Sequence, residues 1–284
     1  MFRQLYAPDD WRSLLLSEVM QSICLPQHLQ EIGRYLKANE GEPLDELRML
    51  LLQLPATVVP PLIRLLGEIQ DRKTREMLSD VLVEIGGGTP HLFASFMNDP
   101  RGTYVQDLVT VLGRIGHESI VSYLAHALQH RDPQVRKAVV KAAAGIYGEF
   151  AERLLIKALT DVDESVRTQA AAHLGNRHTP EAFMALLRVV RDKGFDNRPA
   201  AEVRAFLDGV GISGSNAALD ILQKLLWRKS WFDRRKADTI RQHAAHALAM
   251  IGTPEAEALL LQGQQAGDPT IRQACSHALK ALRH

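Results

Sequence analysis

The chain has 284 residues, of which 46% are hydrophobic and only 6% aromatic, so its apolar content comes mainly from leucine, alanine, valine and isoleucine. This composition favours helix-on-helix packing over a β-sandwich, because small alanines let helices approach closely and leucines fill the space between them. Lysine and arginine total 34 against 33 aspartate and glutamate, a net charge of +1, so no overall field attracts nucleic acid or an anionic membrane. Any basic site must therefore be local.

The amino-terminal segment, MFRQLYAPDDW, lacks the pattern of a secretory signal, and no apolar run reaches the roughly 18 residues of a membrane span. Cys24 and Cys275 lie near opposite ends of the sequence and are expected to be free thiols. These features indicate a cytoplasmic protein without membrane contact.

Residues 1–53 are predicted to form three helices, at 11–23, 25–39 and 43–54, separated by Pro26 and by the NEGEP loop. They match the repeat described next only poorly. We expect them to cap one end of a repeat array or to form a degenerate first repeat.

Residues 54–284 contain an internal repeat, predicted to form about seven helix pairs. One pattern of residue types recurs in the second helix of each pair, as in DPQVRKAVVKAAAGI from Asp132, DESVRTQAAAHLGNR from Asp163 and DPTIRQACSHALKAL from Asp268. The fifth place of the pattern is an arginine in five units and Val105 in a sixth, with successive spacings of 30, 31, 31, 74 and 31. The period is therefore 31 residues, and about a dozen extra residues lie within two units. The arginines are Arg75, Arg136, Arg167, Arg241 and Arg272.

Each place in the pattern has a physical reason. An aspartate four residues before the arginine can accept hydrogen bonds from the free amides of the first helical turn, and a following proline suits the first helical position. The residue before the arginine begins an apolar stripe that continues at helical spacing, as in Val135, Val139, Ala142 and Ile146. Glycines are predicted to end the helices, at Gly86, Gly116, Gly148 and Gly252.

This pattern resembles the HEAT-like repeat of the phycobilisome-lyase type over about residues 54–284. The resemblance implies an all-α fold, an α-solenoid in which antiparallel helix pairs stack into a right-handed superhelix. It also implies that the recurring aspartates and arginines form a structural hydrogen-bonded ladder between adjacent repeats. The ladder residues are Asp71, Arg75, Asp132, Arg136, Asp163, Arg167, Arg241, Asp268 and Arg272.

Catalytic and metal-binding residues are not indicated. His126 with His130, and His243 with His246, have helical spacing, but a metal site needs further ligands that their surroundings do not supply. No phosphate-binding glycine loop and no nucleophile motif occur. We therefore expect a non-enzyme without a cofactor or a metal.

The two insertions are the predicted contact loops, at about 191–204 and 227–238, because extra residues in a solenoid emerge as loops on one face. The segment 227–241 carries six basic residues against two acidic ones, with two of the three tryptophans of the chain. Basic and aromatic residues together are typical of protein-binding surfaces and of single-stranded nucleic-acid sites, but the tryptophans could instead cover an apolar groove.

The favoured hypothesis is a non-enzymatic scaffold that binds a protein or peptide, with nucleic acid as a less favoured partner. Such a scaffold could be the partner-binding arm of a larger signalling or regulatory protein. The alternative is a phycobilin-lyase-like protein or a DNA-repair protein resembling the HEAT-like alkylpurine glycosylases. The predicted partner-binding residues are Trp227, Arg228, Lys229, Trp231, Phe232, Arg234, Arg235, Lys236, Phe195 and Arg198.

Overall fold

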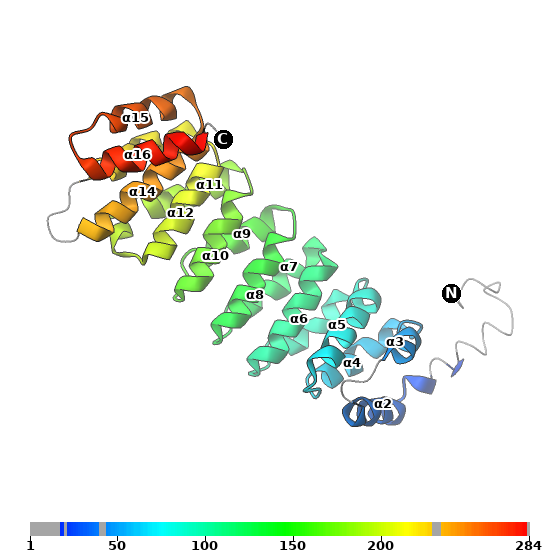
Figure 1. Ribbon diagram of the computed structural model, residues 1–284. Helices are drawn as coiled ribbons and strands as arrows, with labels where there is room; N and C mark the ends of the chain where they lie inside the picture. The colour runs from blue at the N-terminus through cyan, green and yellow to red at the C-terminus, as the bar shows by residue number, and fades with distance from the viewer. Residues whose placement is uncertain (1–17, 20–21, 40–43, 229–233, 283–284) are drawn as a thin grey trace. The chain divides into compact units, whose positions relative to one another are not determined.

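The computed structural model describes residues 18–19, 22–39, 44–228 and 234–282, and these residues form helices and turns without any strand (Figure 1). The chain divides by packing into two compact units, Met1–Ile146 and Tyr147–His284. This division falls inside the repeat array, so the cap predicted at residues 1–53 lies within the first unit and stays a prediction. Most of the helix predicted at 11–23 lies outside the described residues.

The described part of the first unit contains α2 and α3 and continues with three pairs of the repeat. The first helix of the second pair is a 3-10 helix, and short 3-10 turns also lead into two of the α-helices. In chain order the elements are α2 (Pro26–Ala38), α3 (Asp45–Leu51), η2 (Ala56–Val58), α4 (Val59–Leu66), α5 (Arg72–Gly86), η3 (Pro90–Phe96), α6 (Gly102–Ile115), η4 (Glu118–Ile120), α7 (Val121–Ala127) and α8 (Pro133–Ala144).

The second unit continues the same alternation through four further pairs. Its elements are α9 (Glu149–Ala158), α10 (Glu164–Gly175), α11 (Pro180–Val190), η5 (Phe195–Asn197), α12 (Ala200–Ile212), η6 (Asn216–Ala218), α13 (Leu219–Leu226), α14 (Arg234–Ile251), α15 (Pro254–Gln264) and α16 (Pro269–Leu282).

Helix pairs stack within each unit as an α-solenoid, which confirms the predicted fold class (Figure 1). In the first unit the second helices α5, α6 and α8 pack side by side, and in the second unit α10, α12, α14 and α16 do so. Each second helix also packs against the first helix of its own pair. Stacking is required because a single pair cannot bury its apolar faces alone.

The apolar stripe predicted from the repeat forms the core. Val135 and Val139 of α8 are completely buried, as are Val166 and Leu174 of α10. Packing is close between α10 and α12, where a Cβ atom placed on Gly175 would lie 2.7 Å from the Cα atom of Gly209. A side chain at that position would push the two helices apart, because packed cores have no spare volume.

Capping aspartates begin the second helices, as the pattern predicts. The amide of Thr74 donates to the carboxylate of Asp71 at 2.8 Å, that of Gln134 to Asp132 at 2.8 Å, that of Ser165 to Asp163 at 2.9 Å and that of Thr270 to Asp268 at 2.9 Å. These bonds satisfy amides that have no partner inside the helix.

The glycine prediction is correct at Gly116, which follows α6 with a φ of 71° in the left-handed region that glycine tolerates. It is wrong at Gly148. Helix α8 ends earlier, at Ala144, and Gly148 precedes the first residue of α9.

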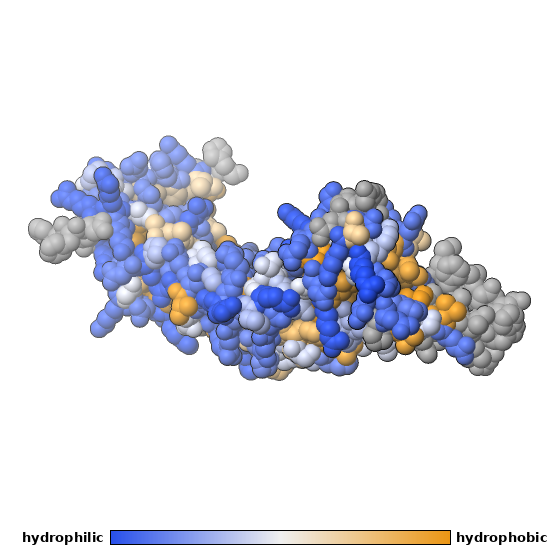
Figure 2. Space-filling model, turned by 90° about the horizontal axis from the view of Figure 1, so that it is seen from below, coloured by the Kyte–Doolittle hydropathy of each residue, from blue (hydrophilic) through white to orange (hydrophobic). Residues whose placement is uncertain are grey.

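Hydrophilic side chains cover most of the surface seen in Figure 2. Apolar side chains are exposed near the start of the first unit, where Leu25 is 46% and Met49 66% exposed. Among the described helices, none is by itself long and apolar enough to cross a membrane, and Asp45–Leu51 with Ala56–Leu66, bent by 112°, meets that criterion only as a pair.

Candidate functional site

The recurring arginine fastens the turn between the two helices of its own repeat. Arg167 donates from Nη1 to the carbonyl oxygens of Asp161, at 2.7 Å, and Val162, at 3.0 Å. Arg136 and Arg272 donate in the same way to the carbonyls six and five residues before them, at distances between 2.7 and 3.2 Å. The arginine is therefore a structural element of the repeat, since it satisfies turn carbonyls that have no helical partner.

Several of these arginines also reach a carboxylate of the following second helix. Arg75 lies 3.3 Å from Asp107 of α6, and Arg241 lies 3.1 Å from Asp268, the capping residue of α16. For Arg167 the carboxylate of the following helix is not an aspartate cap but Glu202, two residues inside α12. Ion pairs between adjacent repeats therefore occur at these three places, and only Arg241 with Asp268 joins two of the predicted ladder residues.

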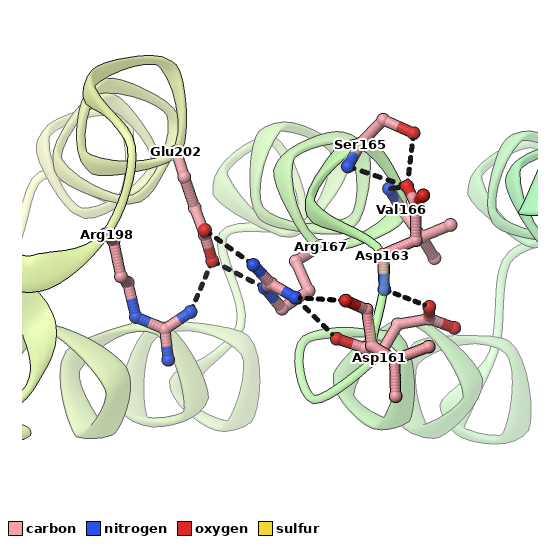
Figure 3. Close-up of polar contacts among 8 residues, drawn as sticks. Asp161, Asp163, Ser165, Val166, Arg167, Arg198 and Glu202 are labelled. Atoms are coloured by element: carbon pink, nitrogen blue, oxygen red, sulfur yellow. Dashed lines mark hydrogen bonds and ion pairs between the residues drawn. The ribbon is translucent and has the colours of Figure 1, made fainter.

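Glu202 joins three elements in a buried network (Figure 3). Its carboxylate accepts two hydrogen bonds from Arg167, Nε to Oε1 at 2.6 Å and Nη2 to Oε2 at 2.8 Å, and a third from Nη1 of Arg198. The Glu202 side chain is completely buried. Burial alone would raise its pKa, but the hydrogen bonds from Arg167 and Arg198 outweigh burial, so the pKa of Glu202 lies below its usual value.

Arg198, in the first inserted segment, is held in position by this network. Its guanidinium also lies over the ring of Phe206, 5.6 Å from the centroid. The same ring packs edge-to-face on Phe195, with centroids 6.3 Å apart. The inserted segment is therefore held to α12 at two points.

The two inserted segments lie next to each other, as the sequence predicts. Arg228, which follows α13, forms an ion pair with Asp196 of η5, and η5 packs on α14. The backbone carbonyl of Arg228 in turn accepts a hydrogen bond from Nη2 of the buried Arg241, at 2.7 Å. We call residues 191–199, 227–228 and 234–236 the insertion corner.

Phe195 is a correction to the predicted contact residues. It is 1% exposed, because its ring fills the space beside Phe206, so it belongs to the core of the second unit and does not present its ring to a partner. Arg198 is paired with Glu202, and Trp227 is half-buried.

Of the other predicted contact residues, Arg228, Arg234 and Arg235 are exposed and Lys236 is half-buried. Lys229, Trp231 and Phe232 lie outside the described residues. Part of each predicted insertion is helical, since α12 begins at Ala200 and α14 at Arg234. Residues 200–204 and 234–238 are therefore helical.

Sequence reasoning missed Glu202 and Asp196 and left the register of the fifth pair unresolved. The structure gives that register: the N-cap of α12 is Pro199, so the place that Arg167 occupies four residues after Asp163 is taken by Val203, 36 residues after Arg167 and 38 before Arg241. The spacing of Arg198 and Glu202, four residues apart, is a signal that the sequence contained, although Arg198 lies just before α12 begins.

Histidines and other possible ligands do not assemble into a metal centre within the described part of the chain, where no group of three histidine, cysteine, aspartate or glutamate side chains could hold an ion. His130 accepts a hydrogen bond from the amide of Asp132 at 3.0 Å, which is a structural role. His246 and His277 line a shallow cavity of about 200 Å³ beside α14 and α16, together with Gln242 and Gln273. Burial lowers the pKa of His243 below its usual value.

Comparison with known proteins settles the family. The family model described as HEAT repeats matches residues 89–154 and 151–239, which together make up just over half of the chain. The chain belongs to the HEAT-repeat family. Both extended repeats of this HEAT array fall largely within the matched residues.

Solved structures similar to this HEAT array share the fold at low sequence identity. The Escherichia coli protein YibA is 14% identical, over 98% of this chain and 99% of YibA, with a TM-score of 0.50. Human deoxyhypusine hydroxylase is 18% identical, over 95% of this chain and 99% of the enzyme, with a TM-score of 0.38. A mutant of Kap121p is 12% identical, over 96% of this chain and 34% of Kap121p, with a TM-score of 0.47. Among proteins with curated functions, none matches the sequence.

Proposed function

We propose that this HEAT array is a non-enzymatic scaffold that binds a protein or peptide, and that the insertion corner is its contact surface. The observation that carries the proposal is the convergence of the two insertions. They are the two largest departures from the 31-residue period, and the ion pair between Arg228 and Asp196 brings them together. Extra residues that converge on one surface of a repeat protein favour a binding role.

The way in which the corner is held supports the same proposal. Arg198 and the backbone of Arg228 are fixed by buried partners, Glu202 and Arg241. Residues that are fixed before binding lose less conformational freedom when a partner arrives. A rigid base beneath exposed side chains is what a recognition surface requires.

Binding, and not catalysis, fits the groups that the corner exposes. Arg228, Arg234 and Arg235 carry guanidinium groups, which stay protonated and bind anions but do not act as nucleophiles or general bases at neutral pH. The two cysteines, Cys24 and Cys275, are free thiols, which is consistent with a reducing, cytoplasmic setting for this binding.

Site-specific cross-linking tests the proposal. A photoreactive amino acid at position 228 should yield cross-linked partner protein from cells of the source organism, whereas the same group at Lys224, which is exposed on the neighbouring helix α13, should yield much less. Equal yields from both positions, or none from either, would contradict a contact surface at the insertion corner.

A further inference from the structure

We propose that the insertion corner takes an acidic segment of the partner protein, whose aspartate or glutamate side chains pair with the exposed arginines of the corner. This inference rests on the proposed function, because it names the chemistry of the partner at the same surface. Four observations carry it: the balance of charge, the first turn of α14, the fixed position of Arg228 and the neutral surroundings.

Positive charge dominates the corner although the chain as a whole is nearly neutral. Seven cationic side chains stand against two carboxylates, Asp192 and Asp196. One cation, Arg198, is neutralised by the buried Glu202, and another, Arg228, is paired with Asp196. The remaining excess is local and attracts anions. The cations are Arg191, Lys193, Arg198, Arg228, Arg234, Arg235 and Lys236.

The first turn of α14 places cations where they disfavour the helix. Arg234, Arg235 and Lys236 are its first three residues, and no acidic residue accompanies them in that turn. The helix macrodipole favours negative charge at this end, as with Glu149 and Glu152 in α9 and the acidic residues of α11 and α15, whereas α5 likewise begins with two cations, Arg72 and Lys73. Carboxylates of a partner would relieve the unfavourable charge.

The position of Arg228 is set before any partner arrives. Its side chain is 53% exposed, while its backbone carbonyl is bound by Arg241, which is itself 7% exposed. Asp196 pairs with Nη1 of the guanidinium, and the rest of this group faces solvent. Arginine offers five donors in a planar fork, so it can pair with a second carboxylate in addition to Asp196.

The surroundings of the corner favour a short acidic protein segment over nucleic acid. Elsewhere on the second unit, exposed charges alternate in sign, as in the pairs of Glu149 with Arg153 and Asp220 with Lys224. At these two places a cation is paired with a carboxylate, whereas a phosphate backbone is bound by a run of cations. Phe195 is buried and its ring is not available to stack on a base.

Fluorescence anisotropy with the full chain tests the inference directly. The probe is a short fluorescein-labelled peptide of alternating glutamate and alanine, and its control is the same peptide with glutamine in place of glutamate. A single-stranded oligonucleotide of matched length is the third ligand. The acidic peptide is expected to bind saturably, and the glutamine peptide is not.

The informative variant is Arg234→Glu with Arg235→Glu. It should weaken acidic-peptide binding by at least about tenfold, because two attractive charges become repulsive. The new glutamates favour the start of α14, so the variant should fold at least as stably as the wild type. The matched control is Lys141→Glu with Lys280→Glu, which makes the same change in net charge at exposed lysines of α8 and α16 and should leave affinity nearly unchanged.

Three results would overturn the inference: no binding of the acidic peptide, equal weakening by both double variants, or tighter and more salt-sensitive binding of the oligonucleotide. The last would assign the corner to nucleic acid. Cross-linking of a partner at position 228 without binding of the acidic peptide would leave the proposed function standing and reject only the acidic chemistry. Failure of both experiments would reject both.

Discussion

Repeat four, α9 with α10, and repeat six, α13 with α14, both use an arginine of the second helix to bond the turn between their two helices, but the turns differ in length. In repeat four Arg167 bonds the carbonyls of a short turn, six and five residues before it. In repeat six the corresponding Arg241 bonds the carbonyl of Arg228, thirteen residues before it. The longer repeat keeps the internal arginine bond although more residues separate its two helices. The arginines that hold the fold are thus different residues from Arg228, Arg234 and Arg235, which we propose contact a partner.

The largest effect is expected for Glu202→Ala. Removal of the carboxylate leaves Arg167 and Arg198 facing each other in a mostly buried site, and loss of one partner from a buried ion pair lowers the free energy of unfolding by about 3 kcal/mol or more. Urea denaturation of the full chain measures this. Glu181→Ala, at an exposed residue of α11, is the control and should change stability by less than about 1 kcal/mol. Equal effects of the two substitutions would show that the network is not stabilising.

The same carboxylate should give the stability a specific dependence on pH. The pKa of Glu202 is lower in the folded protein than in the unfolded chain, so its stabilising contribution is present above the unfolded pKa, about 4.3, and is lost as the pH falls through the folded pKa. The wild type should therefore exceed Glu202→Gln in stability most at neutral pH, and the difference should shrink below about pH 4. A difference that stays constant from neutral to acidic pH would contradict this assignment.

Two arginines at equivalent places in the repeat should differ in importance. Arg241 is buried and also donates to the Thr270 hydroxyl at 2.7 Å, whereas Arg272 is exposed and bonds only turn carbonyls among its described contacts. Arg241→Ala should lower the free energy of unfolding by about 2 kcal/mol, and Arg272→Ala by less than about 1 kcal/mol. Thermal and urea denaturation of both variants would decide. Similar losses would mean that the bonds between repeats contribute little.

The smallest effect is expected at the start of α14. Arg234→Glu alone should raise the free energy of unfolding by about 0.5 kcal/mol, because a negative charge replaces a positive one near the positive end of the helix dipole. The increase should diminish at high salt, since the site is exposed. A loss of stability would indicate that Arg234 makes a structural contact and is not reserved for a partner.

Much of the fold could be predicted because the repeat recurs at a regular spacing and its helix caps have local causes. The 31-residue spacing of the arginines located the second helices, and capping by Asp132 and Asp163 follows from local chemistry alone. Burial of Phe195 could not be predicted, because it depends on Phe206 of the next helix and on the register of the extended repeat. Glu202 was overlooked for a related reason. A charged residue in a first turn is usually solvated, and only the stacking of α12 on α10 brings Arg167 to it.

Separation of the structural arginines from the partner-binding arginines is tested most directly by two measurements on Arg234→Glu with Arg235→Glu. These are the affinity for the acidic peptide and the midpoint of urea denaturation, each compared with the wild type. We expect affinity to fall by at least about tenfold while the midpoint stays the same or rises. Unchanged affinity, or a loss of affinity accompanied by an equal loss of stability, would contradict the assignment of these residues to binding.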